Sequence, residues 1–372
     1  MPVDYQTLDL RIRRHKSNDE SEQLHIEAIG PKGEWAKSIV PTDNLRDILN
    51  TVNNGPGLDI SGDLLADLAI PRGNIRELYK DVLERTLPNY GLRLKLHLLE
   101  DTRDLVQLPW ESIRIKGNPI AKHRYQSIVR TIDICEPATS MAVEKPPYRI
   151  LMVNSSPKNL SDYGLSERKS EVDLAQIETL KSLAEHNLVQ IESHDNVTID
   201  QLENLLKMNR YQIFHFTGPV KQLSERTDWI LFFTKANGEA EIVRSHHLGN
   251  VLLDTGVKMA FLNAIDTAGA PAEALLKAKL PVVVAYNGRI SIAAARKFIV
   301  AFYGSLSKEN SLERAMLAGR LSIAADDLST QEWAMPVLFT RSLDGRFWTG
   351  KAGYKIETFF QDGRLVAEAK EI

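Results

Sequence analysis

The chain has 372 residues, of which 43% are hydrophobic and 26% charged, and its formal net charge is −3. This balance is typical of a folded globular protein with room for two packed units. It excludes a disordered chain and a strongly basic nucleic-acid-binding protein. The single cysteine, Cys135, excludes an internal disulfide framework and indicates a small buried side chain in a reducing compartment. The first residues lack the signal-peptide pattern, and no apolar run approaches the roughly 20 residues that span a bilayer. We therefore expect a cytoplasmic protein without membrane contact.

Residues 1–141 are expected to form a strand-rich subdomain. Leu8–Arg13 and Leu24–Ile29 alternate apolar and polar residues, which predicts antiparallel strands with one solvent-exposed face. A helix over 75–87 and a strand over 92–98 follow.

One basic run lies in the first predicted strand and consists of Arg11, Arg13, Arg14, His15 and Lys16. Its simplest interpretation is a solvated strand end, so we expect no nucleic acid as a partner. The weaker alternative is a phosphate-binding patch, which would give retention on a polyanion that fades steeply with salt.

Residues 142–147 contain two prolines and no periodicity, which predicts a linker. A second unit is expected over residues 147–345, and residues 346–372 predict a terminal β-hairpin. The second unit begins with Ile150–Asn154, a near-continuous apolar strand of the kind that is covered on both faces.

Strands and helices then alternate along the second unit. One helix opens at Thr198, where Gln201 completes a capping box. The other predicted elements are strands over 189–193, 212–217, 229–233, 258–263 and 281–286, and helices over 166–188, 245–253, 272–279, 291–307 and 311–325. This alternation predicts a parallel sheet with helices on both faces.

Several short motifs occur in order along the chain. They are Leu108-Pro109-Trp110-Glu111, Ile128-Val129-Arg130, the strand at 148–157, Ala301-Phe302-Tyr303 with Ser311-Leu312-Glu313-Arg314-Ala315, and Glu332-Trp333-Ala334-Met335-Pro336-Val337-Leu338. In this order the motifs resemble the CHAT domain, a bacterial caspase-like protease family named for its association with tetratricopeptide repeats. The resemblance implies an α/β fold, with a caspase-like, mostly parallel sheet flanked by helices and an N-terminal strand-rich subdomain. It also implies a structural role for Trp110, between the two subdomains.

The family places its catalytic histidine and cysteine at two turns, and this chain has other residues at both positions. The histidine is the second in an H-x-x-G-H-G pattern, which reads His215-Phe216-Thr217-Gly218-Pro219-Val220 here. The nucleophile follows Leu262-Asn263-Ala264, where this chain has Ile265. Proline and isoleucine supply neither an imidazole base nor a thiolate. Pro219 also lacks the backbone N–H that the family's turn offers to an oxyanion.

Four residues near these turns are predicted to line the vestigial cleft: His215, Gly218, Asn263 and Asp266. We interpret His215 as a structural histidine in an apolar strand. The alternative is a hydrolase with a displaced site near His215, Asn263 and Asp266, which alanine at His215 or Asp266 would inactivate.

No metal or cofactor site is predicted. The adjacent pair His246-His247 lacks the helical spacing that brings two ligands to one metal. Residues 345–352 nearly match the phosphate-loop pattern, but Ala352 replaces the magnesium-binding hydroxyl and Phe347 and Trp348 crowd the loop. We interpret this segment as a turn.

Together these features predict a catalytically inactive CHAT protein that acts as a subunit, adaptor or regulator through protein–protein contacts. The resemblance implies a bacterial conflict or immunity system, in which active relatives are found. The expected partner is another protein, such as an active protease or a repeat protein of the same system. The vestigial cleft is expected to suit an extended strand that it does not cut. The oligomeric state is left open.

Overall fold

A computed structural model describes most of the chain. The described residues are 4–16, 22–42, 45, 62–87, 89–98, 100–132, 147–165, 189–222, 229–325 and 331–341, with the backbone of 354–361 and 364–371. Four predicted features lie wholly or mostly outside these residues: the helix over 166–188, the linker over 142–147, Cys135, and the turn at 345–352.

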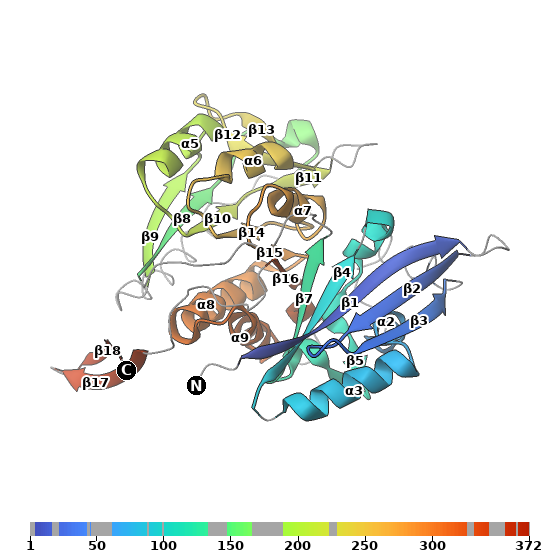
Figure 1. Ribbon diagram of the computed structural model, residues 1–372. Coiled ribbons are helices and arrows are strands. Elements are labelled where there is room, and N and C mark those ends of the chain that lie inside the picture. Colours follow the sequence, from blue (N-terminus) through green and yellow to red (C-terminus); the bar gives the residue numbers. More distant parts are fainter. Residues whose placement is uncertain are drawn as a thin grey trace.

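The largest sheet in the described residues has 11 strands and runs through both the N-terminal and the C-terminal halves of the described fold (Figure 1). In spatial order it contains β3 (Trp35–Pro41), β2 (Glu22–Ile29), β1 (Tyr5–Lys16), β4 (Gly91–Leu98), β7 (Gln126–Ile132), β16 (Pro336–Thr340), β15 (Val282–Tyr286), β14 (Met259–Asn263), β10 (Ile213–Thr217), β8 (Tyr148–Asn154) and β9 (Val189–Asp195). Neighbouring strands are parallel except in the pairs β1–β2, β2–β3 and β15–β16. The predicted α/β class with a mostly parallel sheet is confirmed. Strands β1 and β2 pair antiparallel as predicted, whereas β4 pairs in parallel with both β1 and β7.

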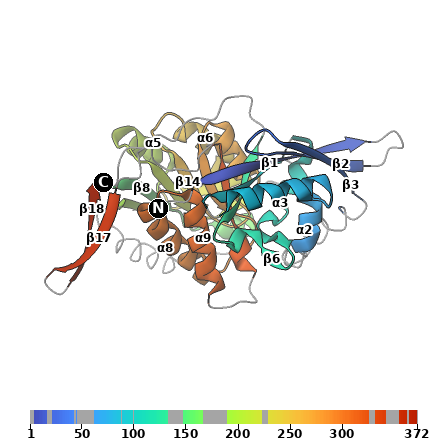
Figure 2. The same ribbon diagram turned by 60° about the horizontal axis from the view of Figure 1, so that its bottom comes forward.

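Helices lie on both faces of this sheet (Figure 2). The described helices are α2 (Gly62–Ala69), α3 (Asn74–Thr86), α5 (Ile199–Met208), α6 (Ser245–Leu252), α7 (Ala270–Lys277), α8 (Ile292–Glu309) and α9 (Leu312–Ala324), with short 3₁₀ segments at 100–107, 110–112, 120–122, 160–163 and 332–334. Six of these helices match the predictions to within about two residues. The exception is α2, because eight residues are too few to show a clear period. The capping box of α5 is confirmed, since Thr198 Oγ1 accepts from the N–H of Gln201 and the Gln201 side chain accepts from Thr198 N–H.

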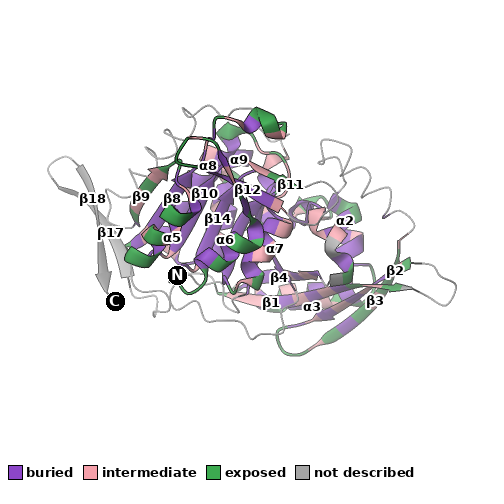
Figure 3. Ribbon diagram, turned by 90° about the horizontal axis from the view of Figure 1, so that it is seen from above, coloured by how far each residue is buried: buried purple, intermediate pink, exposed green. Residues whose placement is uncertain are grey.

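The core has two layers, one on each face of the sheet. Alternate residues of a strand point to opposite faces. In β10, Ile213 packs in the layer that contains α8 and α9, and Phe214 packs in the layer that contains α5, α6 and α7. Figure 3 shows the central strands as the most buried part of the molecule. The near-continuous apolar strands of the sequence are therefore strands covered on both faces.

One predicted strand belongs to a different sheet. Residues 229–233 were expected in the parallel sheet, but β12 (Trp229–Thr234) lies between β11 (Val220–Gln222) and β13 (Ala240–Arg244) in a separate antiparallel sheet. The cause is the tight turn between β12 and β13, where the N–H of Lys235 donates to the Glu239 carbonyl and Gly238 has a φ of 87°. So short a turn makes the two strands pair with each other as a hairpin. Two further strand pairs are β5–β6 (Arg114–Ile115, Asn118–Pro119) and β17–β18 (Tyr354–Gln361, Arg364–Glu371).

The two halves of the large sheet meet where β7 lies beside β16. Their register contains one residue pair, Arg130 with Phe339. The side chain of Arg130 is fully buried and forms an ion pair with the fully buried carboxylate of Glu111. Its Nε donates to Glu111 Oε1 at 3.0 Å, and its two Nη atoms donate to the carbonyl oxygens of Val106 and Leu108. The predicted boundary between subdomains is thus crossed by one continuous sheet.

Two other buried side chains complete this junction. Trp110 is fully buried, as its predicted structural role requires, and its indole N–H donates to the carbonyl of Leu105 at 2.8 Å. Arg320 of α9 is also buried. Burial lowers the pKa of Arg320 to about 10, and the negative charge of Glu111 opposes that shift. The carboxylate of Glu111 therefore acts on two buried guanidinium groups.

We predict that Glu111→Gln destabilises the protein strongly. Removing one member of a buried ion pair leaves an uncompensated charge, which costs about 3–5 kcal/mol of the free energy of unfolding. Urea unfolding measures the effect. The control is Glu203→Gln, which breaks an exposed pair with Lys207 and should cost about 0.5 kcal/mol or less. Equal losses from the two substitutions would contradict a central role for Glu111.

Candidate functional site

The two positions that the motifs single out lie at the same edge of the sheet. Strands β10 and β14 are parallel neighbours, and Thr217 pairs with Asn263 at their carboxyl ends. Asn263 Nδ2 donates to Thr217 Oγ1 at 3.1 Å and ties the two strand ends together. Pro219 and Ile265 each lie two residues beyond one member of this pair. Parallel register alone therefore brings the two turns to one edge, where open α/β sheets bind ligands.

The turn after β14 presents Ile265 to solvent. Its side chain is 48% exposed, although it follows a fully buried strand. The next residue, Asp266, has a φ of 56°, a left-handed conformation that Asp tolerates better than most residues. The buried hydroxyl of Thr267 holds this turn, because it donates to the carbonyls of Leu262 and Ala264 and accepts from Tyr286 N–H. Sequence reasoning missed Thr267. The signal available was a small hydroxyl residue directly after the turn that follows an apolar strand.

The turn after β10 is fixed by backbone bonds on both sides. The Thr217 carbonyl accepts from the N–H of Ser155 at 2.8 Å, and the Pro219 carbonyl accepts from Phe232 N–H at 3.0 Å. Gly218 is buried, and a Cβ at this position would lie 2.5 Å from the Phe216 ring. A larger residue therefore cannot replace Gly218 without moving that ring. The turn leads directly into β11 of the small sheet.

His215 does not line a cleft, which corrects one of the four cleft predictions. Its side chain is fully buried on the face covered by α8. The imidazole stacks on Phe261 with ring centroids 4.7 Å apart, and its Nδ1 lies 3.0 Å from the Tyr303 hydroxyl. The error arose because His215 belongs to the same short motif as Pro219, whereas the alternation of β10 points it into the core. It is a structural histidine.

The surroundings of His215 are almost entirely apolar. Burial lowers the pKa of His215 to about 3, because there is little water to solvate an imidazolium. Burial raises the pKa of the Tyr303 hydroxyl, so this hydroxyl stays protonated, and it forms a hydrogen bond with Nδ1. A neutral histidine that substrate cannot reach is not placed to act as a general base.

The other two predicted cleft residues differ in environment. Asn263 is buried, and its amide is used to hold Thr217. Asp266 is an exposed residue, yet partial burial of its carboxyl raises its pKa, while the nearby Arg289 opposes that shift. The structure therefore places His215 in the core and Asp266 at the rim, and it gives no direct contact between them.

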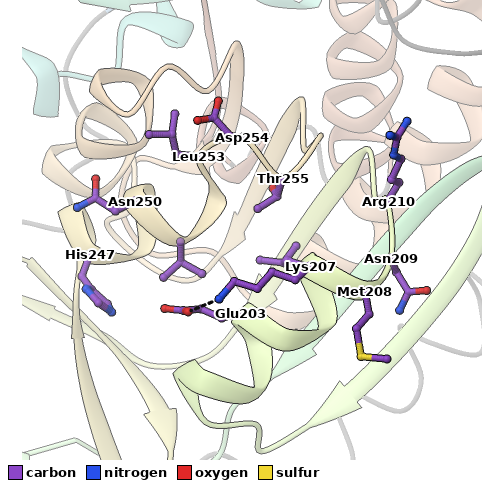
Figure 4. A pocket seen from close by; sticks show the side chains of 12 residues that line it. Glu203, Lys207, Met208, Asn209, Arg210, His247, Asn250, Leu253, Asp254 and Thr255 are labelled. Carbon is purple, nitrogen blue, oxygen red and sulfur yellow. Dashed lines mark hydrogen bonds and ion pairs between the residues drawn. The ribbon is translucent and has the colours of Figure 1, made fainter.

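A pocket of about 600 Å³ lies elsewhere, between α5 and α6 (Figure 4). Its lining includes Met208, Leu253 and the ion pair between Glu203 and Lys207. These residues precede β10 and β14 in the chain, so the pocket lies at the amino ends of the strands. It contains none of the predicted site residues.

The residues that the structure describes contain neither a metal-binding cluster nor a membrane-spanning helix. In those residues no group of three or more His, Cys, Asp or Glu side chains is placed to hold a metal ion. No helix in the same part of the chain has the length and apolar character needed to cross a membrane.

Comparison with protein families accounts for the order of the motifs. The model of the CHAT domain matches residues 73–341, which is more than half of the chain. The chain belongs to the CHAT-domain family. The resemblance drawn from the motifs is confirmed, and the matched residues include both turns. No curated protein matches the chain.

Several solved structures match this CHAT protein over most of its length at low sequence identity. The Arg-specific cysteine proteinase gingipain R is 12% identical with a TM-score of 0.46, and the match covers 85% of this chain and 78% of that one. The complex of Porphyromonas gingivalis RgpB pro- and mature domains is also 12% identical with a TM-score of 0.46, over 82% and 76% of the two chains. The Saccharomyces cerevisiae separase–securin complex is 14% identical with a TM-score of 0.41, over 72% of this chain and 17% of that chain.

The buried state of His215 predicts a loss of stability in mild acid. The unfolded chain takes up a proton near the ordinary histidine pKa of 6.5, whereas the folded chain stays neutral until about pH 3. Because the unfolded state binds more protons in this range, stability falls as the pH drops below 6.5. Between pH 7 and pH 5 we expect His215 to lower the free energy of unfolding by about 2 kcal/mol.

The double variant His215→Phe with Tyr303→Phe tests this prediction. It removes both hydrogen-bonding partners together, so neither is left unsatisfied. Urea unfolding at several pH values should show a smaller acid loss than in the parent protein. The control replaces the exposed His247 by Phe. An unchanged acid slope in the double variant would contradict the assignment of His215 as a buried neutral histidine.

Proposed function

We propose that this CHAT protein is catalytically inactive and acts through protein–protein contacts as a subunit, adaptor or regulator. The observation that carries the proposal is the position of Pro219 and Ile265. Both follow paired residues at the carboxyl ends of β10 and β14, where the family motif has its histidine and cysteine. Neither side chain can transfer a proton or attack a carbonyl carbon.

The environment of the turns supports the same proposal. Ile265 exposes an apolar side chain at the edge of the sheet, where it can contact a partner. The carbonyl of Pro219 is engaged by Phe232, so this turn is held in place without any catalytic group. An extended segment of a partner would lie across the carboxyl ends of these strands and would not be cut.

The displaced-site hydrolase has no comparable support. It would need His215 and Asp266 to act on one substrate, but His215 is in the core and packs against Tyr303. For the biological setting we propose a bacterial conflict or immunity system and a cytoplasmic location. The partner would be another protein of that system, such as an active protease or a repeat protein.

The first test is a hydrolysis assay on an unfolded, fluorescently labelled protein substrate. We expect the parent chain to release no more label than a buffer control. Any hydrolysis that is lost in Asp266→Ala, or in the double variant of His215 and Tyr303, would overturn the proposal in favour of a displaced site. Hydrolysis that persists in both variants and co-elutes with the protein would also overturn the proposal. Hydrolysis that elutes separately would come from a contaminating protease.

The second test is capture of the partner from native cells, with stoichiometry measured by mass spectrometry. We expect one protein near one-to-one, and Ile265→Arg should weaken its capture roughly tenfold or more, because it places a charge at the centre of the contact. The matched control is Leu64→Arg on α2, because Leu64 and Ile265 are both 48% exposed. Capture of no protein by the parent chain would contradict a constitutive subunit role.

A further inference from the structure

The large sheet ends at β3, which is an edge strand in the part of the chain that the structure describes. It lies in the N-terminal half, away from β10 and β14 (Figure 1). Trp35 is 61% exposed and Ile39 is 50% exposed, and Lys37 between them is also exposed. These three side chains share one face, because they alternate along the strand. Large apolar side chains on an edge strand are unusual, since an edge offers unpaired backbone groups to other chains.

The opposite face of β3 packs against the core of the protein. Ala36 is buried in the core layer that also contains residues of α3. A strand added beside β3 would therefore extend a sheet whose inner face is already packed against the core. The other end of the sheet differs, because the exposed residues of β9 are the polar Gln190, Ser193 and Asp195.

Charges alternate across the strands in the row that contains Lys37. In the backbone register, Lys37 lies opposite Glu27 of β2, and Glu27 lies opposite Arg11 of β1. Opposite charges on directly paired residues stabilise a sheet, and like charges destabilise it. Lys37 forms no ion pair with the described residues, so the next position in this row favours an acidic side chain. The neighbouring positions, beside Trp35 and Ile39, favour apolar side chains.

We propose that β3 binds an extended segment of another protein by strand addition. The segment would carry an apolar residue, any residue, an acidic residue, any residue and an apolar residue in that order. This pattern reads the same in both directions, so it fits a parallel or an antiparallel strand. The surface goes beyond the proposed function, because it uses neither Pro219 nor Ile265.

A second copy of this chain is a poorer occupant than such a segment. Two β3 strands that paired antiparallel about Lys37 would place Trp35 against Ile39 of the other copy. The same register would place Lys37 against Lys37, which is a like-charge pair. Lysine on an edge strand is a known means of preventing self-pairing. Lys37 therefore selects an acidic partner over a second copy.

The test measures binding of a labelled synthetic peptide with the acidic pattern by fluorescence anisotropy. A matched peptide has lysine in place of the acidic residue. We expect the parent protein to prefer the acidic peptide about fivefold or more at low salt, and Lys37→Glu to reverse the preference. Lys235→Glu is the control, since it makes the same charge change at an exposed loop residue. An acidic peptide with methylated backbone nitrogens should bind neither protein, because it cannot donate to β3.

Several outcomes would overturn the proposal. One is no binding of the acidic peptide to the parent protein, and another is the same preference in Lys37→Glu. A parent protein that forms dimers in sedimentation equilibrium, and loses them on Trp35→Ser, would assign the edge to a second copy. Loss of peptide binding in Ile265→Arg would place the peptide at the other site. Hydrolytic activity would overturn only the proposed function, because binding at β3 does not depend on catalysis.

Discussion

The ion pair between Glu111 and Arg130 is the constraint on which the joining of the two halves depends. The backbone register between β7 and β16 has one residue pair, so side chains must supply much of the connection. A buried charge is costly unless it is paired and its hydrogen bonds are satisfied. Arg130 meets this requirement with one carboxylate and two carbonyl oxygens. The charge of the same carboxylate also raises the pKa of Arg320 against the effect of burial. Two motifs of the family are therefore structural parts of one junction.

The frame around the two turns does not depend on catalytic residues. Asn263 holds Thr217, and Thr267 holds the turn that carries Ile265. None of these bonds needs a histidine at 219 or a cysteine at 265. The geometry of this edge therefore does not depend on the side chains at 219 and 265, because other residues make the bonds that position the two turns. This independence is why a family match states the fold and leaves the function to be tested.

The sequence predicted what is local or ordered along the chain. The period of apolar residues located most helices and strands, and the order of the motifs identified the family. It did not predict contacts between distant segments. The junction of β7 with β16 joins residues far apart in the sequence, and no periodicity reports such a pairing. The separate sheet of β12 was missed for a similar reason, since a turn of a few residues decided its partner.

His215 shows the limit of reading a motif as a site. A short motif suggests that its members act together, but the pleat of a strand directs alternate side chains to opposite faces. His215 and Phe216 are adjacent in the motif and belong to different core layers. The turn residues beyond the strand are the ones that reach the edge. In this fold a residue's distance from the strand end therefore decides whether it meets solvent, and motif membership alone does not.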